Sequence, residues 1–141
     1  MIHASDPTYL NQQYGNACNL DARVALHQLY STHPQDWHEW VYDQFDLPPR
    51  ARILELGCGP GHLWRSNQAR LSARWQIVLS DLSPGMVAQA RQSVCAAGSA
   101  GEHLFSFLVH DAQALPYPAY TFDAVVANHM LYHVPDKQRV L

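Results

Sequence analysis

The sequence lacks the features that mark nucleic-acid-binding, membrane and secreted proteins. Its formal net charge is −3 over 141 residues, and its nine lysines and arginines are scattered along the chain, so we expect no basic surface that attracts nucleic acid or anionic lipid. No apolar stretch approaches the length of a membrane span. Residues 1–7 lack the basic start and the apolar run of a secretion signal. We therefore expect no nucleic-acid partner and no membrane span.

Cysteine pairs and metal-ligand clusters are also missing. The three cysteines, Cys18, Cys58 and Cys95, are odd in number and form no Cys-x-x-Cys pair, which favours a reducing compartment. The closest two of the nine histidines are His129 and His133, and no acidic or cysteine residue completes a zinc-like spacing around them. We expect a cytoplasmic protein without a bound metal.

What the sequence does contain is enough apolar side chain, 48% of its residues, for one packed domain. Residues 1–49 are predicted to form an N-terminal helical segment of that domain. A first helix would present an apolar face at Leu20, Val24 and either His27 or Tyr30. A second helix, over 35–45, carries a stripe that we predict to be packing surface, made of Trp37, Trp40, Val41 and Phe45.

Residues 50–141 alternate between short apolar runs and helical stretches. The helical stretches cover 62–71 and 84–97, and the second has Ser83 as an N-cap and Pro84 in its first turn. The apolar runs, predicted to be strands, cover 52–56, 75–79, 104–109 and 122–127. This alternation is typical of an α/β fold with a doubly wound, Rossmann-like parallel sheet.

Glycine and polar residues follow each predicted strand, where open parallel sheets bind their ligands. Glycine permits a left-handed φ and a close approach of ligand to backbone, and a carboxylate after the second strand suits the hydroxyls of a ribose. Such carboxylates can also simply cap the next helix, but capping does not require glycine at alternate positions. In chain order the strand-end residues are Gly57, Gly59 and Gly61, then Asp81, then Asp111 with Ala112, then Asn128.

The spacing of the glycines bears on which cofactor is bound. A dinucleotide loop reads Gly-x-Gly-x-x-Gly, whereas this loop reads Gly-x-Gly-x-Gly and has Glu55 two residues before its first glycine. A carboxylate there would repel a pyrophosphate but suits a ligand that carries an ammonium group. A nicotinamide-dependent oxidoreductase is therefore disfavoured.

Three ordered segments resemble the motifs of class I S-adenosylmethionine-dependent methyltransferases. They are residues 53–61, ILELGCGPG, residues 80–86, SDLSPGM, and residues 122–128, FDAVVAN. Within that family the chain is most similar to the small-molecule group that includes the ubiquinone and menaquinone biosynthesis methyltransferases. The resemblance implies S-adenosylmethionine as cofactor, S-adenosylhomocysteine as product, and methyl transfer to a small-molecule acceptor.

The resemblance also implies a position for each part of the cofactor. The methionine part would lie near Glu55 and the loop of Gly57, Cys58, Gly59 and Gly61, with the Asn128 carbonyl facing its ammonium. Asp81 would bind the ribose hydroxyls. The adenine would lie between Leu82 and Met86 on its face and Asp111 and Ala112 at its edge, although Met86 could instead be core because it shares a helix face with Ala90 and Val94.

A general base is needed only if the acceptor must lose a proton. His133 is the first candidate because it follows the fourth strand; His129, Tyr132 and Tyr14 are others, and packing or capping is the alternative for each. Cys58 could be activated by the following helix or could simply be a small residue between glycines.

The family has a seven-stranded sheet, and the sequence offers four strands, so we expect the C-terminal part of the fold to be lacking. The strand 122–127 would then be an apolar edge. We expect it to be covered by self-association, by the N-terminal helices or by the rest of a longer protein. The alternative to a methyltransferase is therefore a truncated cofactor-binding or interaction module without turnover of its own.

Overall fold

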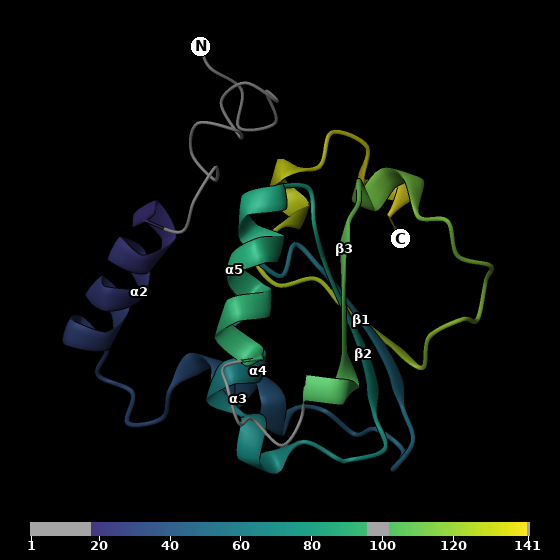
Figure 1. Cartoon of the computed structure of the whole chain (residues 1–141). Helices are drawn as coiled ribbons and strands as arrows, with labels where there is room; N and C mark the ends of the chain where they lie inside the picture. The colour runs from purple at the N-terminus through teal and green to yellow at the C-terminus, as the bar shows by residue number, and fades with distance from the viewer. Residues whose placement is uncertain (1–17, 96–101, 141) are drawn as a thin grey trace.

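Four parallel strands form the centre of a computed structural model that describes residues 18–95 and 102–140 (Figure 1). They are β1 (Arg52–Leu56), β2 (Gln76–Asp81), β3 (Phe105–Val109) and β4 (Ala124–Val126), in the spatial order β3-β2-β1-β4. The predicted α/β fold class is confirmed, and each predicted strand exists. The fourth is three residues long instead of six: its pairing with β1 runs only from Ala124 to Val126, and just before it the backbone N–H of Arg52 donates to the side chain of Asp123.

The helices are α2 (Cys18–Tyr30), α3 (Trp37–Asp43), α4 (His62–Ser66) and α5 (Pro84–Val94). Figure 1 shows α3, α4 and α5 on one face of the sheet. As predicted, Ser83 caps α5, because its side chain accepts a hydrogen bond from the backbone N–H of Met86. No helix of the described residues is long and apolar enough to cross a membrane.

The helix predicted over 62–71 is wrong in length, because α4 ends at Ser66. The side-chain amide of Asn67 donates to the carbonyls of Leu63, at 2.8 Å, and of His38, at 3.1 Å. The Leu63 carbonyl is the one that a continuing α-helix would offer to the Asn67 backbone, so the backbone tightens instead into a 3₁₀ turn over Gln68–Arg70. Asn67 therefore ends one helix and ties it to another.

The core lies between the sheet and these helices. Alternate strand residues point to that face, and those residues are buried against Trp64 of α4 and against Ala90 and Val94 of α5. The strand residues concerned are Ile53, Ile77, Leu79, Phe105 and Val126. The apolar runs of the sequence are thus explained on this face by helix packing.

The second face of the sheet is less covered. Leu54, Val78 and Val125 share this face across β1, β2 and β4, and no α-helix of the described residues lies on it (Figure 1). Leu54 is buried because it is central, whereas Val125 in the edge strand is 57% exposed. Helix α3 lies on the other face and α2 to one side of the sheet, so neither provides the cover that was one of the three alternatives for the fourth strand; the other two stay predictions.

The predicted aromatic stripe of the second helix is wrong for its tryptophans. Val41 is buried and Phe45 half-buried, as expected, but Trp37 and Trp40 are 40% and 46% exposed. Tyr42, which was not in the stripe, is buried instead, and its hydroxyl donates to the carbonyl of Arg70 at 2.8 Å. The short α3 can bury only the side that faces the sheet.

The first predicted helix exists as α2, but its predicted apolar face does not pack as a face. Val24 is half-buried, whereas His27 is exposed and Tyr30 is 75% exposed. The side chain of Leu20 lies outside the described residues. Figure 1 shows α2 to one side of the sheet, which is why its apolar side chains find few neighbours.

Candidate cofactor site

The loop between β1 and α4 carries three glycines in the left-handed region. The φ angles of Gly57, Gly59 and Gly61 are +63°, +53° and +76°, a conformation that side chains with a Cβ seldom adopt. The backbone N–H of Cys58 donates to the carbonyl of Ser80 at 3.0 Å. The loop is therefore fixed to the end of the neighbouring strand β2.

Gly57 lies directly under the side chain of Met130, which comes from the segment after β4. A Cβ added to Gly57 would meet the Met130 Cβ at 2.6 Å and its Cγ at 3.0 Å. Met130 could not be singled out from the sequence, because this contact joins residues far apart in the chain. The two residues bring the ends of β1 and β4 together.

Replacing Gly57 with Ala should lower the free energy of unfolding by about 2–4 kcal/mol, from the left-handed φ and the overpacked contact together. Thermal and urea denaturation would measure it. Met130→Gly removes the atoms that would collide with the new Cβ. In that background Gly57→Ala should therefore lower the free energy of unfolding by less than it does in the parent. An equal loss in both backgrounds would show that Met130 does not limit the space at Gly57.

Glu55 is a buried carboxyl in the middle of this site. It is 3% exposed, and its Oε2 accepts a hydrogen bond from the indole Nε1 of Trp64 at 2.6 Å. The pKa of Glu55 is raised to about 8, mainly by burial and to a smaller extent by the Asp81 carboxylate, while the Trp64 hydrogen bond opposes the rise. Within 18–95 and 102–140 no Lys, Arg or His pairs with it. A positively charged group of a ligand could therefore pair with Glu55 in its ionised form.

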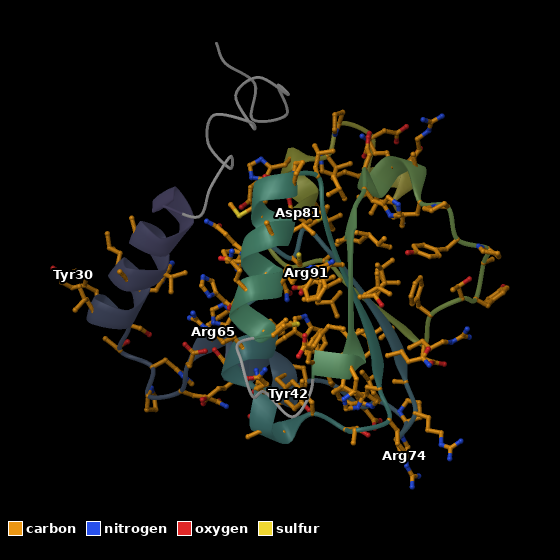
Figure 2. All side chains as sticks on the ribbon, in the orientation of Figure 1. Tyr30, Tyr42, Arg65, Arg74, Asp81 and Arg91 are labelled. Atoms are coloured by element: carbon orange, nitrogen blue, oxygen red, sulfur yellow. The ribbon has the colours of Figure 1, made fainter. Side chains whose placement is uncertain are left out.

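Asp81 joins the glycine loop to the start of α5. Its Oδ2 accepts from the backbone N–H of Gly59 and its Oδ1 from that of Ser83, both at 2.9 Å. Burial raises the pKa of Asp81, and these backbone hydrogen bonds counteract the rise. In Figure 2 Asp81 lies at one end of the sheet and Arg74, which precedes β2, at the other. The carboxylate is thus at the carboxyl edge, as the sequence predicted.

The residues that follow Asp81 differ in exposure. Leu82 is 55% exposed beside the carboxylate, so its side chain is open to a ligand. Met86 is 1% exposed within α5, which fits the core alternative better than a place on the adenine face. Both adenine contacts stay predictions.

The third strand end is arranged as a cap. Asp111 is exposed and begins the 3₁₀ turn Ala112–Ala114, where its Oδ1 accepts from the backbone N–H of Gln113 at 2.9 Å. The Gln113 side-chain amide also donates to both oxygens of Asp111. The capping alternative therefore has direct contacts here, and the adenine-edge role of Asp111 and Ala112 stays a prediction.

The fourth strand end offers an unused donor. The side-chain Nδ2 of Asn128 is buried and has no hydrogen-bond partner. Buried polar groups are nearly always paired, so a donor in this state beside the ends of β1 and β4 points to a missing acceptor.

The candidates for acid-base chemistry lie close to that end. His133 and Tyr132 are in ring contact, with centroids 4.2 Å apart, and the His129 ring contacts Trp37 at 4.7 Å. Tyr14 lies outside the described residues. Burial, helped by the charges of Glu55 and Asp81, raises the pKa of the Cys58 thiol, so the suggestion of an activated cysteine is wrong and the residue is a small filler in the loop.

A family model described as a methyltransferase domain matches residues 53–141. The chain belongs to the class I S-adenosylmethionine-dependent methyltransferases. A demethylmenaquinone methyltransferase of Symbiobacterium thermophilum is 29% identical over 118 residues, which are 83% of this chain and 46% of that protein. The predicted family and its cofactor, S-adenosylmethionine, are confirmed.

Solved structures show the same fold. The [4+2]-cyclase SpnF matches this chain with a TM-score of 0.71 and 26% identity, over 93% of this chain and 52% of that one. An S-adenosylmethionine-dependent methyltransferase from Aquifex aeolicus matches with a TM-score of 0.62 and 16% identity, over 96% and 63%. The chain spans about half the length of the curated relatives it matches.

The residues at the strand ends of this chain fit the family's cofactor. The buried Glu55 carboxyl suits a cationic ligand, and the unpaired Nδ2 of Asn128 suits an acceptor atom. Sequence reasoning found Glu55 and Asp81 but missed Trp64, the donor to Glu55. Its signal was available, since an indole three residues into the helix after a glycine loop can reach back to the strand end.

Proposed function

We propose that this chain is the cofactor-binding half of an enzyme that transfers a methyl group from S-adenosylmethionine to a small-molecule acceptor. The observation that carries the proposal is the buried Glu55, which has no basic partner among the described residues and lies beside a glycine loop that Asp81 ties to β2. The family's cofactor is a cation with a ribose, and these two carboxyls suit its two ends. The small-molecule acceptor is supported by the relatives named for quinone methylation.

In this proposal each strand end has one task. Glu55 and Asn128, at the ends of β1 and β4, hold the methionine part together with the loop of Gly57, Cys58, Gly59 and Gly61. Asp81 binds the ribose hydroxyls, and Leu82 lies against the adenine. Met86, Asp111 and Ala112 would complete the adenine pocket; Met86 is buried in α5, and Asp111 also caps the turn Ala112–Ala114.

The bound cofactor supplies an activated methyl group on a sulfonium, so the protein contributes mainly position and exclusion of water. His133 is our candidate for holding an acceptor proton, since it lies in the turn Leu131–His133 after β4. The free thiols of Cys58 and Cys95 are compatible with the cytoplasmic location predicted from the sequence.

Calorimetric titration of the chain tests the cofactor assignment. S-adenosylmethionine and S-adenosylhomocysteine should bind, and NAD should not; binding of NAD alone would overturn the proposal. Binding without turnover over a broad acceptor panel would favour the second candidate, a cofactor-binding or interaction module. The exposed β4 edge favours that module, because such an edge is a site for association.

We propose further that two copies associate through the edge of residues 122–127. Val125→Lys should then raise the dimer dissociation constant about tenfold or more in light scattering, because two lysines would meet across the interface. Val109→Lys is the matched control, since Val109 is 48% exposed in β3 at the opposite edge. A folded monomeric parent whose Val125 and Val126 amides exchange freely would contradict this association.

A further inference from the structure

Four ring side chains from three separate segments meet beside the glycine loop. Trp37 and His38 come from α3, His62 begins α4 directly after Gly61, and His129 follows Asn128. The ring centroids of Trp37 and His129 are 4.7 Å apart with a tilt of 39°, those of Trp37 and His38 are 5.2 Å apart, and those of His38 and His62 are 5.7 Å apart. None of the cofactor contacts proposed above uses these rings.

The backbone of His129 is held in an uncommon conformation. Its φ is +52°, which costs a residue with a Cβ about 1 kcal/mol or more and persists where the surroundings fix it. The side chain of His129 contacts the Trp37 ring. This conformation lies directly after Asn128, whose side-chain donor is buried and unpaired.

The backbone next to Trp37 is held by hydrogen bonds at the start of α3. The Asp36 side chain accepts from the backbone N–H of His38 at 2.8 Å and caps α3, and the Asn67 amide donates to the His38 carbonyl at 3.1 Å. Although its backbone is fixed in this way, the Trp37 side chain stays 40% exposed, and His129 is exposed as well. The pair therefore presents fixed, open ring surface.

The surroundings of the pair favour an uncharged ligand. Burial lowers the pKa of His38, and the charges of His62 and Arg65 lower it slightly further. The Asp36 carboxylate raises it but does not cancel the effect of burial. The His38 imidazole that contacts Trp37 is therefore neutral near neutral pH and adds no positive charge of its own beside the Trp37 ring. What the pair offers is stacking area.

The pair also lies toward the reactive end of the cofactor. Asp81 follows β2 and His129 follows β4, on opposite sides of the central β1. With the ribose at Asp81 and the methionine part at Glu55 and Asn128, the acceptor must approach from the β4 side.

We propose that Trp37 and His129 form one wall of the acceptor site and bind, by stacking, an acceptor that carries a planar conjugated ring. This assignment rests on the proposed function for its place beside the cofactor. It makes the N-terminal helix α3 a determinant of acceptor specificity and not a packing element alone.

Titration with two uncharged probes of the same carbon skeleton tests the wall. We expect 2-naphthol to bind the chain saturated with S-adenosylhomocysteine, and its saturated analogue decahydro-2-naphthol to bind about tenfold more weakly. Trp37→Leu and His129→Asn should each weaken 2-naphthol about fivefold, as expected for one lost stacking contact, and Trp37→Phe should keep most of the affinity. Asn is chosen at 129 because it tolerates a left-handed φ.

Trp40→Leu is the matched control, since Trp40 is 46% exposed on the same helix and has no place in the wall. It should change 2-naphthol binding less than twofold, and all variants should bind S-adenosylhomocysteine as the parent does. Equal binding of the two probes, or equal losses at Trp37 and Trp40, would overturn the wall. If S-adenosylhomocysteine does not bind, the proposed function fails, while the same titration of the free chain still decides whether the wall stacks a planar ring.

Discussion

Replacing Glu55 with Gln is expected to stabilise the free chain above neutral pH and to weaken its binding of S-adenosylmethionine. The folded chain keeps the Glu55 proton until about pH 8, whereas the unfolded chain releases it near pH 4.5, the ordinary value for this group. Between these values the unfolded state binds fewer protons, so stability falls as pH rises through this window. The full loss is on the order of 5 kcal/mol.

Gln at position 55 removes the titration and can still accept the Trp64 hydrogen bond. Urea denaturation at pH 5.5 and 8.5 should therefore show a large loss for the parent and a much smaller loss for Glu55→Gln. Glu39→Gln, which changes an exposed carboxyl on α3, is the matched control and should behave as the parent. If the parent and Glu55→Gln respond to pH in the same way, Glu55 is not the buried acid that the structure indicates.

Cofactor binding by the same variant should change in the opposite direction. The ammonium of the cofactor would pair with ionised Glu55, and a charge-assisted hydrogen bond of this kind is worth about 10- to 100-fold in affinity. Below pH 8 the parent must release a proton to bind, so its advantage over Glu55→Gln should grow as pH rises toward 8. The ratio of the two affinities cancels the titration of the cofactor itself, and calorimetry at three pH values would measure it.

Replacing Asp81 with Ala is expected to reduce cofactor affinity by about 100-fold or more, because two charge-assisted hydrogen bonds to the ribose are lost. It should also lower the free energy of unfolding by about 1–3 kcal/mol, since the backbone N–H groups of Gly59 and Ser83 lose their acceptor. Calorimetric titration and thermal denaturation would measure the two effects.

Asp111→Ala is the matched control at the next strand end. Asp111 is exposed and bonded to Gln113, so its loss should cost cofactor affinity about tenfold at most. Equal losses at Asp81 and Asp111 would mean that the adenine edge contributes as much as the ribose. An unchanged affinity in Asp81→Ala would remove Asp81 from the site.

The strands and the glycine loop could be predicted from the sequence because their causes are local. An apolar run of five or six residues that ends in glycine or aspartate predicts a buried parallel strand and its turn, and β1 and β2 follow that pattern. The family motifs supplied Glu55 and Asp81 in the same way.

The remaining features depend on contacts between distant residues. Asn67, whose side chain ends α4, also donates to the distant carbonyl of His38. The lack of space for a Cβ at Gly57 is set by Met130. The exposure of Trp37 and Trp40 follows from where α3 docks, and helical spacing alone placed both in the core. Neither composition nor periodicity contains such information.

The partly uncovered second face of the sheet affects how much of this protein a cell can accumulate. Chaperones and proteases act on exposed apolar surface of the kind that Val125 presents in an edge strand. The amount of protein that accumulates would then depend on how quickly this face meets its covering partner after synthesis, and not on the equilibrium stability of the core alone.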